Sequence, residues 1–269
     1  IYENTMKLTD THSHLYDTAF DADREEALAR AAAAGVEHLL LPGIDSESHG
    51  ALFDLCRRHP GQCVPMMGLH PTSVNDNPRW QEELALVERY LQTPPEGIEG
   101  FCAVGEIGLD LYWSRDFRDD QAEAFRRQID LSLQYGLPIA VHTRDAWPET
   151  AAIMREYRGQ GVRGVFHAFS DGIGTYRKLK EYGDFAFGIG GVVTFKKSKL
   201  AEVVREMELR DIVLETDCPY LTPAPHRGER NESAYVRYVC EKVAELKGLT
   251  PAEVAEATTA NAKRIFKGI

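Results

Sequence analysis

The feature of this sequence that most constrains its fold is an alternation, repeated eight times, of short apolar runs with longer helical stretches. The apolar runs occupy residues 9–14, 38–43, 63–70, 101–106, 137–142, 164–167, 185–189 and 212–217. The helical stretches occupy residues 21–35, 48–59, 78–92, 119–135, 146–158, 175–182, 200–208 and 232–247, followed by a last helix that starts at Thr250 and Pro251. Continuous apolar runs are typical of strands buried on both faces of a parallel sheet. Eight such βα units predict an α/β fold, a closed TIM-type (β/α)8 barrel.

The size and composition of the chain agree with one barrel. At 269 residues and 43% hydrophobic residues, the chain can bury a large core, and barrels of this size are routinely single domains. We therefore expect one domain over residues 6–269, and we expect residues 1–5, before Met6, to be a remnant of cloning. The five cysteines form an odd set without a CxxC pair, which predicts reduced and mostly buried thiols.

Hydropathy and charge limit the functions that this chain can have. No apolar stretch approaches the roughly 20 residues that span a bilayer, and no charged-then-apolar leader starts the chain, so we expect a cytoplasmic protein without membrane contact. The formal net charge of -11 argues against a surface that coats nucleic acid. It permits an enzyme that grips a few phosphates locally. No obligate protein partner is evident, and the oligomeric state is open.

Residues that can bind metal fall at the ends of five predicted strands, where barrels carry their chemistry. An isolated His-x-His pair is more often a surface residue beside a satisfied core histidine, but alternate residues of a strand share a face and can project together. These candidate ligands are His12, His14, Glu106, His142, His167 and Asp217. Four imidazoles and two carboxylates exceed the needs of one tetrahedral ion. The pattern therefore predicts two divalent metal ions, with Glu106 from the middle of the barrel as the bridging carboxylate.

Other polar side chains could contact a substrate. His70 ends the third predicted strand and could donate to a phosphate, protonate a leaving alkoxide, or be a satisfied strand-end histidine. Arg144 and Arg227 could clamp a phosphate because a guanidinium group matches phosphate bidentately, although a surface ion pair is at least as common for each. Lys196 belongs to the densest basic cluster and follows strand seven, where barrels often bind phosphate. Trp113 and its neighbour Tyr112 could stack an unpaired base or pack locally.

Several motifs together resemble the TatD family of metal-dependent deoxyribonucleases. They are DTHSHL at 10–15, GLHP at 68–71, VGEIGLD at 104–110, Gln121 with Phe125 and Gln128, PIAVHTRDA at 138–146, VFHAFS at 165–170, LETDCPYL at 214–221, PHRGERNE at 225–232 and TTANA at 258–262. The resemblance covers essentially everything from Met6 onward. It implies an amidohydrolase-like barrel that hydrolyses DNA phosphodiesters, typically from a 3′ end, with divalent metal. Ser13 stands where the family usually has Cys, and Ser233 stands where Pro is common.

The resemblance and the barrel geometry together suggest roles. One ion would be held by His12, His14, Glu106 and Asp217, and the other by Glu106, His142 and His167. Asp217 would be the general base for the attacking water, or a ligand alone. Glu215, two residues earlier, would orient a ligand histidine or form a buried ion pair. Imidazole-rich ligation suits Zn or Mn better than Mg, whereas the resemblance implies Mg, so we expect two ions of Mg, Mn or Zn.

Three functions remain possible at this point. The first is a deoxyribonuclease that acts on single-stranded DNA ends. The second is an amidohydrolase-type enzyme that hydrolyses a small amide, lactone or phosphoester, although the predicted fourth strand lacks the lysine that often bridges the metals in the phosphotriesterase-like branch. The third is a non-catalytic metal-binding protein, which a full ligand set plus a candidate base argues against. The sequence leaves open whether the substrate is DNA, RNA or a small molecule, and whether cleavage starts from an end.

Overall fold

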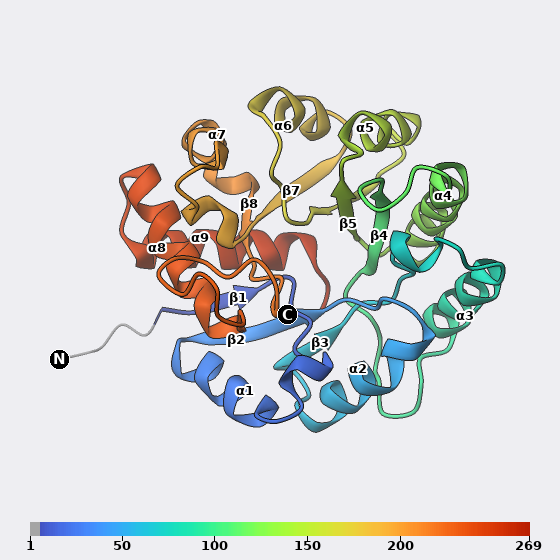
Figure 1. Cartoon of the computed structure of the whole chain (residues 1–269), viewed down its shortest axis with the longest axis horizontal. Coiled ribbons are helices and arrows are strands. Elements are labelled where there is room, and N and C mark those ends of the chain that lie inside the picture. Colours follow the sequence, from blue (N-terminus) through green and yellow to red (C-terminus); the bar gives the residue numbers. More distant parts are fainter. Residues whose placement is uncertain (1–5) are drawn as a thin grey trace.

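The structure, a computed structural model, describes residues 6–269, so the expected cloning remnant at 1–5 lies outside the described residues. Its centre is a ring of parallel strands surrounded by helices (Figure 1). The strands are β1 (Leu8–Asp10), β2 (Val36–Leu41), β3 (Cys63–Pro65), β4 (Val104–Asp110), β5 (Ile139–Arg144), β6 (Arg163–Phe166), β7 (Asp184–Ile189) and β8 (Ile212–Leu214). The predicted alternation of strands and helices in a TIM-type barrel is confirmed.

The helices that cover the ring follow the predicted order. They are α1 (Arg24–Ala33), α2 (Ser46–Arg58), α3 (Trp80–Gln92), α4 (Arg118–Tyr135), α5 (Trp147–Glu156), α6 (Ile173–Lys180), α7 (Leu200–Glu206), α8 (Val236–Lys247) and α9 (Pro251–Ile265). α9 begins after Thr250, as predicted, and its start has a capping box in which the Thr250 side chain accepts from the backbone N–H of Glu253. Within residues 6–269, no helix combines the length and the apolar character that crossing a bilayer requires.

The ring is closed by two seams that are thinner than the rest of the sheet. Backbone ladders join β1, β2 and β3 in one parallel sheet and β4 to β8 in another. Isolated parallel bridges, Met67 with Val104 and Ser13 with Cys218, connect the two sheets. The second seam lies beside the histidines that follow β1. The backbone there leaves regular strand geometry to present side chains to the barrel end.

The predicted strand boundaries were wrong at the candidate site residues. β3 ends at Pro65, so His70 does not end it; β5 continues to Arg144, so His142 lies inside it; and β6 ends at Phe166, so His167 follows it. β1 ends at Asp10 and β8 at Leu214, so His12, His14 and Asp217 follow their strands and do not lie within them. β4 continues to Asp110, so Glu106 lies inside the strand and does not end it. The boundaries differ because the length of a strand is set by hydrogen bonding to the neighbouring strand, and not by where the apolar run stops. Residues 108–110 pair with residues 142–144 of β5 and prolong β4.

The barrel interior has an apolar layer beneath the polar end. Ala140, Val165 and Val213 are buried and precede polar residues of the barrel end by two positions, so they share a strand face with them. They belong to a cluster that also includes Ile265 and Phe266 at the end of α9, which closes the barrel opposite the polar end. The five cysteines are all free and buried, as predicted.

Candidate metal centre

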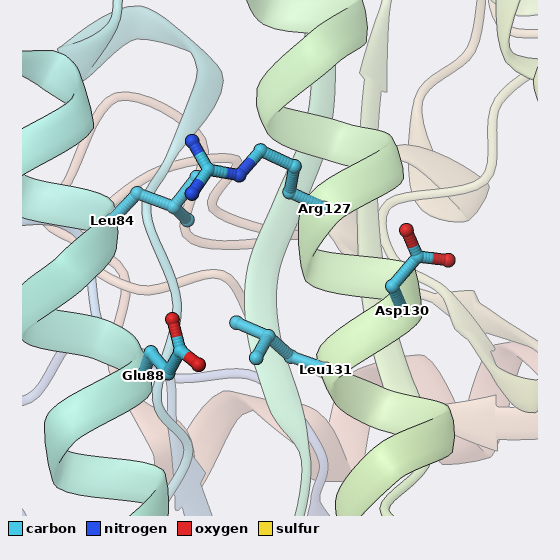
Figure 2. A pocket seen from close by; sticks show the side chains of 5 residues that line it. All are labelled: Leu84, Glu88, Arg127, Asp130 and Leu131. Atoms are coloured by element: carbon cyan, nitrogen blue, oxygen red, sulfur yellow. The ribbon is translucent and has the colours of Figure 1, made fainter.

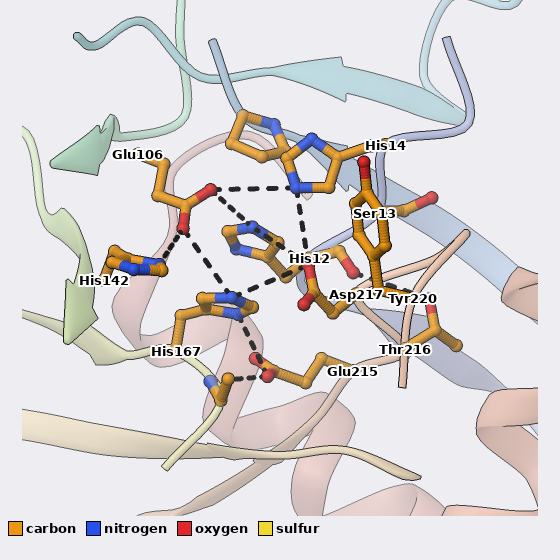
Figure 3. A network of polar contacts seen from close by, with 12 residues as sticks. His12, Ser13, His14, Glu106, His142, His167, Glu215, Thr216, Asp217 and Tyr220 are labelled. Atoms are coloured by element: carbon orange, nitrogen blue, oxygen red, sulfur yellow. Dashed lines mark hydrogen bonds and ion pairs between the residues drawn. The ribbon is translucent and has the colours of Figure 1, made fainter. Parts of the chain in front are cut away.

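The Glu106 carboxylate is the hub of a buried polar cluster (Figure 3). Its Oε2 atom lies 3.0 Å from Nε2 of His12 and 3.7 Å from Nε2 of His14. Its Oε1 atom lies 2.8 Å from Nδ1 of His142 and 3.7 Å from Nε2 of His167. The two oxygens of one carboxylate therefore face two different groups of imidazoles. This division is the geometry that a bridging carboxylate requires.

Asp217 faces the cluster from the strand-eight side. Its Oδ1 atom lies 3.4 Å from Nε2 of His14, 3.7 Å from Nε2 of His167 and 4.0 Å from Nε2 of His12. The residue adopts a left-handed backbone with φ of 56°, and its N–H donates to the carbonyl of His12 over 2.9 Å. Such a conformation is costly for a residue other than glycine and is concentrated at functional sites. Here it turns the Asp217 carboxylate toward the histidines.

Two histidines are each held by a carboxylate on the side away from the centre. Nε2 of His142 lies 3.0 Å from Oδ2 of Asp110, and Nδ1 of His167 lies 3.0 Å from Oε1 of Glu215. A carboxylate can only accept, so the ring nitrogen that it contacts keeps its N–H when the imidazole binds a metal. The other nitrogen of each ring faces Glu106 and would supply its lone pair to a bound cation in place of a proton.

A tyrosine does the same for His14. The Tyr16 hydroxyl donates to the carbonyl of Pro42 over 2.6 Å, so it accepts at 3.0 Å from Nδ1 of His14. Nε2 of His14 is therefore the lone-pair nitrogen, and it points to Glu106 and Asp217. Three imidazoles, from β5, from the segment after β6 and from the segment after β1, thus turn a ring nitrogen toward the Glu106 carboxylate.

His70 has the opposite arrangement. Its Nδ1 accepts from the backbone N–H of Thr72 over 3.1 Å, which leaves the proton on Nε2. That Nε2 lies 3.4 Å from Oε1 of Glu106. The imidazole of His70 therefore presents a donor to the centre, because its only other nitrogen already accepts from the Thr72 backbone. Geometry separates His70 from the ligand candidates even though its ring is equally close.

The electrostatics of the cluster favour positive charge beside an ionised Glu106. Burial opposes the ionised Glu106, but the surrounding imidazoles outweigh it and hold the pKa of that carboxyl well below its usual range. Burial lowers the pKa of His12 and of His70. Burial also acts against protonation of His142, but bonds to Asp110 and Glu106 prevail and raise its pKa to about 9.

The donor set fits divalent metal. Among the described residues, three groups place their ligand atoms within 4.8 Å of one another: His12, Glu106 and His167; His12, His14 and Asp217; and His70, Glu106 and His142. Imidazole nitrogens and carboxylate oxygens are the ligands that Zn and Mn accept. The six ligand candidates are thus brought together by segments spread over the whole chain.

Gln121 and Gln128, which the resemblance included without a role, support the cluster from α4. Gln121 accepts from the N–H of Asp110 over 2.8 Å and donates to its carbonyl over 2.9 Å. Gln128 holds the backbone of Leu69, the neighbour of His70, in the same way. It accepts from the N–H of Leu69 over 2.7 Å and donates to its carbonyl over 3.1 Å. The two buried glutamines lie seven residues apart, on one face of the helix. In the sequence, the signal for this supporting role is two amide side chains that interrupt the apolar face of a predicted helix.

The residues expected to bind substrate are not in contact with the cluster. The Arg144 guanidinium lies over the ring of Tyr112 at 3.7 Å from its centroid, and the Arg227 guanidinium lies over Phe195 at the same distance. Arg227 also donates to the carbonyl of Thr222 over 3.1 Å. Lys196 is exposed at the end of the segment that follows β7.

A separate surface pocket lies between α3 and α4 (Figure 2). Its lining consists of Leu84, Glu88, Arg127, Asp130 and Leu131. None of the residues of the polar cluster lines it. The pocket is therefore distinct from the candidate centre.

The sequence profile of a family described as TatD related DNase matches residues 9–267. A Bacillus subtilis (strain 168) protein named "Uncharacterized metal-dependent hydrolase YabD" is 38% identical over 261 residues, which cover 97% of this chain and 99% of that relative. The "3'-5' ssDNA/RNA exonuclease TatD" of Erwinia tasmaniensis is 31% identical, with 94% of this chain and 97% of the relative covered. The crystal structure of YJJV, a TatD homolog from Escherichia coli K12, superimposes with a TM-score of 0.87 at 27% identity, covering 97% and 98% of the two chains.

A barrel whose polar end gathers imidazoles around a buried carboxylate, together with these relatives, defines a metal-dependent hydrolase. The chain belongs to the TatD related DNase family.

Proposed function

We propose that this protein is a deoxyribonuclease that uses two divalent metal ions to hydrolyse phosphodiester bonds at the 3′ end of single-stranded DNA. The observation that carries the proposal is the division of Glu106, whose Oε2 faces His12 and His14 while its Oε1 faces His142 and His167. One carboxylate between two sets of imidazoles suits a pair of ions. The relative named as an exonuclease supports the choice of a nucleic acid as substrate.

In this proposal, the chain's own groups divide the work. Glu106, His12, His14 and Asp217 would hold one ion, and Glu106, His142 and His167 the other. Bound divalent ions would lower the pKa of a water molecule and neutralise charge on a phosphate. Asp217 would accept the proton of the attacking water, because its carboxylate lies at the open side of the cluster and is ionised. Burial acts to raise its pKa, but the nearby histidines outweigh burial and lower it.

His70 and Glu215 would have supporting roles. The N–H of His70 at Nε2 would donate to a phosphate oxygen or to the leaving 3′ alkoxide, because its other nitrogen is already occupied by the backbone of Thr72. Glu215 would fix the ring of His167 through the 3.0 Å contact with Nδ1. Arg144, Arg227 and Lys196 would meet the DNA outside the centre, since none of them contacts the cluster.

The test is an end-labelled single-stranded oligonucleotide incubated with chelator-stripped protein, with and without added Mg²⁺ or Mn²⁺. We expect a metal-dependent ladder that starts at the 3′ end. Asp217→Asn should reduce the rate about 100-fold or more, because a positioned general base typically contributes 10²–10⁴-fold. Glu99→Gln is the matched control, since Glu99 is an exposed carboxylate outside the cluster.

Three results would contradict parts of this proposal. Intact DNA after incubation with protein that has rebound its metal would favour the small-molecule hydrolase. Fragments that begin in the interior of the strand would contradict attack from the end. Equal cleavage of the same sequence as RNA would widen the substrate class to both nucleic acids.

A further inference from the structure

Large apolar side chains are rarely exposed in this protein, and the exceptions share a location. Among the described residues, the exposed ones are Tyr112, Trp113, Tyr220 and Leu249. The three aromatic ones all lie in segments that leave the polar end of the barrel, and they are 51%, 69% and 57% exposed. Single exposed apolar residues are normal on a protein surface, but here the exposed aromatic rings of the described chain are confined to the end of the barrel that carries the polar cluster, which makes them candidates for contact with a ligand.

The first aromatic site is tied to the His142 side of the centre. Asp110 contacts Nε2 of His142 through Oδ2, and through Oδ1 it accepts from the backbone N–H of Tyr112 over 3.1 Å. One carboxylate therefore links a candidate metal ligand to the start of the Tyr112–Trp113 pair. The two rings meet edge to face, with centroids 4.9 Å apart.

The guanidinium group of Arg144 packs against the rings of this pair. Arg144 follows His142 by two positions on β5, and it is paired with Asp110 in the ladder between β4 and β5. Its guanidinium lies 3.7 Å from the centroid of Tyr112 and 5.5 Å from that of Trp113. Tyr112 is thus held on one face by a cation, and Trp113, the most exposed aromatic residue of the described chain, remains available to a ligand.

The second aromatic site lies on the opposite, His14 side. Tyr220 follows Asp217 by three residues, and its N–H donates to the Asp217 carbonyl over 2.9 Å. The Tyr220 ring meets the His14 ring at 66°, with centroids 6.5 Å apart (Figure 3). One exposed ring therefore adjoins each of the two imidazole groups that Glu106 separates.

We propose that Trp113, backed by Tyr112 and Arg144, and Tyr220 on the other side stack the two unpaired bases that flank the phosphate at the metal centre. This inference rests on the proposed nuclease function and adds residues that recognise the single strand. Aromatic stacking is tolerant of sequence and carries no charge. A chain with a net charge of -11 cannot rely on a broad basic groove, so uncharged stacking suits it as a source of affinity for DNA. A duplex end hides the faces of its bases, whereas a single strand offers them.

The test compares two substrates and two pairs of variants in the metal-loaded enzyme. One substrate is a single-stranded oligothymidylate, and the other has the same length with abasic tetrahydrofuran residues at its last two 3′ positions. The variants are Trp113→Ala and Tyr220→Ala, with Trp113→Phe and Tyr220→Phe as controls that keep a ring. We expect each alanine variant to lower kcat/KM on the normal substrate on the order of 5- to 150-fold, and each phenylalanine variant to recover most of that loss.

The abasic substrate separates stacking from other effects. The unaltered enzyme should cleave it more slowly than the normal substrate, and the alanine variants should not lose activity on it, since the base that would stack is already absent. A loss of equal size on both substrates would overturn stacking, and so would equal rates of the unaltered enzyme on both. In either case, cleavage of the normal substrate would leave the nuclease function standing. Failure of the unaltered enzyme to cleave either oligonucleotide would overturn both proposals.

Discussion

Oδ2 of Asp110 lies 3.0 Å from Nε2 of His142, on the side of the imidazole away from Glu106. The His142 ring is therefore held between two carboxylates, because its Nδ1 lies 2.8 Å from Oε1 of Glu106. Asp110 is buried, and Gln121 fixes its backbone at both the N–H and the carbonyl. The position of one imidazole is thus determined by a chain of contacts that runs from α4 through β4 to β5.

Asp110→Asn should weaken metal binding while the fold persists. The amide is neutral, so the His142 nitrogen on the Glu106 side, Nδ1, becomes a less basic ligand. The loss of such a carboxylate partner typically costs 10- to 100-fold in metal affinity. Asp116→Asn, an exposed acid in the following loop, is the matched control. Zn²⁺ affinity measured by competition with a chromophoric chelator checks the prediction. An affinity within two-fold of the unaltered protein would rule out a positioning role for Asp110.

Gly188→Ala should disturb the centre from β7. A methyl group at Gly188 would collide with the Glu215 carboxylate, which accepts from the N–H of Ala168 over 2.6 Å and faces His167. Overpacking of this kind costs about 1–3 kcal/mol in the free energy of unfolding. Displacement of Glu215 should also lower metal affinity. Gly174→Ala on α6 is the control, because nothing lies within 4 Å of the added methyl and alanine favours a helix.

Urea denaturation and metal titration together test this second prediction. Gly188→Ala should lower both the free energy of unfolding and the affinity for metal, whereas Gly174→Ala should lower neither. A Gly188→Ala protein with unchanged metal affinity would show that the Glu215 carboxylate does not position His167.

Metal removal should lower the thermal stability of the protein. A ligand that binds only the folded state stabilises it by about 2.7 kcal/mol at a hundred times its dissociation constant. For a chain of this size that corresponds to a rise in Tm of about 5–10 °C. Calorimetry of chelator-stripped protein, with and without Zn²⁺ or Mn²⁺, measures the shift. The double variant Glu106→Gln with Asp217→Asn should show no shift, and an equal shift in that variant would place the bound metal elsewhere.

The sequence predicted the gathering of the six ligand candidates because each of them follows or interrupts an apolar run. In a barrel, that pattern is sufficient to bring distant residues to one end, whatever the strand boundaries. The inward layer beneath them, such as Ala140 before His142 and Val165 before His167, follows from the same two-residue period. This part of the site could be predicted because each strand carries its own local pattern and the closed barrel brings the strand ends together.

The parts that the sequence did not predict depend on contacts between elements. Arg144 stacks on Tyr112 because the β4–β5 register pairs it with Asp110, and no local pattern specifies that register. The proton on Nε2 of His70 follows from a backbone N–H two residues later, in a short helical turn. Asp110 lies beyond the predicted end of its strand at Glu106 and entered the resemblance without a role, so its contact with His142 was not predicted.

A cluster of charges outside the centre should make stability depend on pH. The Asp23 carboxylate accepts from Arg230 over 2.6 and 2.8 Å and from Arg30 over 2.9 Å, and it joins the start of α1 to the loop after β8. Hydrogen bonds from these guanidinium groups hold the pKa of Asp23 below its ordinary value. A carboxyl whose pKa is lower in the folded state contributes stability above its unfolded pKa of about 3.9, and that contribution is lost as the pH falls below it.

Asp23→Asn should therefore cost about 1 kcal/mol at pH 7, a value reduced by the partial exposure of the pair. The cost should shrink as the pH falls below about 4, because the unfolded chain then takes up a proton at this carboxyl while the folded protein still keeps it ionised. Asparagine is as good as aspartate at the start of a helix, so the comparison isolates the charge. Urea denaturation of both proteins across this pH range, with Glu99→Gln as the exposed control, measures the difference. A gap that stays constant with pH would mean that shape, and not the ion pair with Arg230 and Arg30, accounts for the effect.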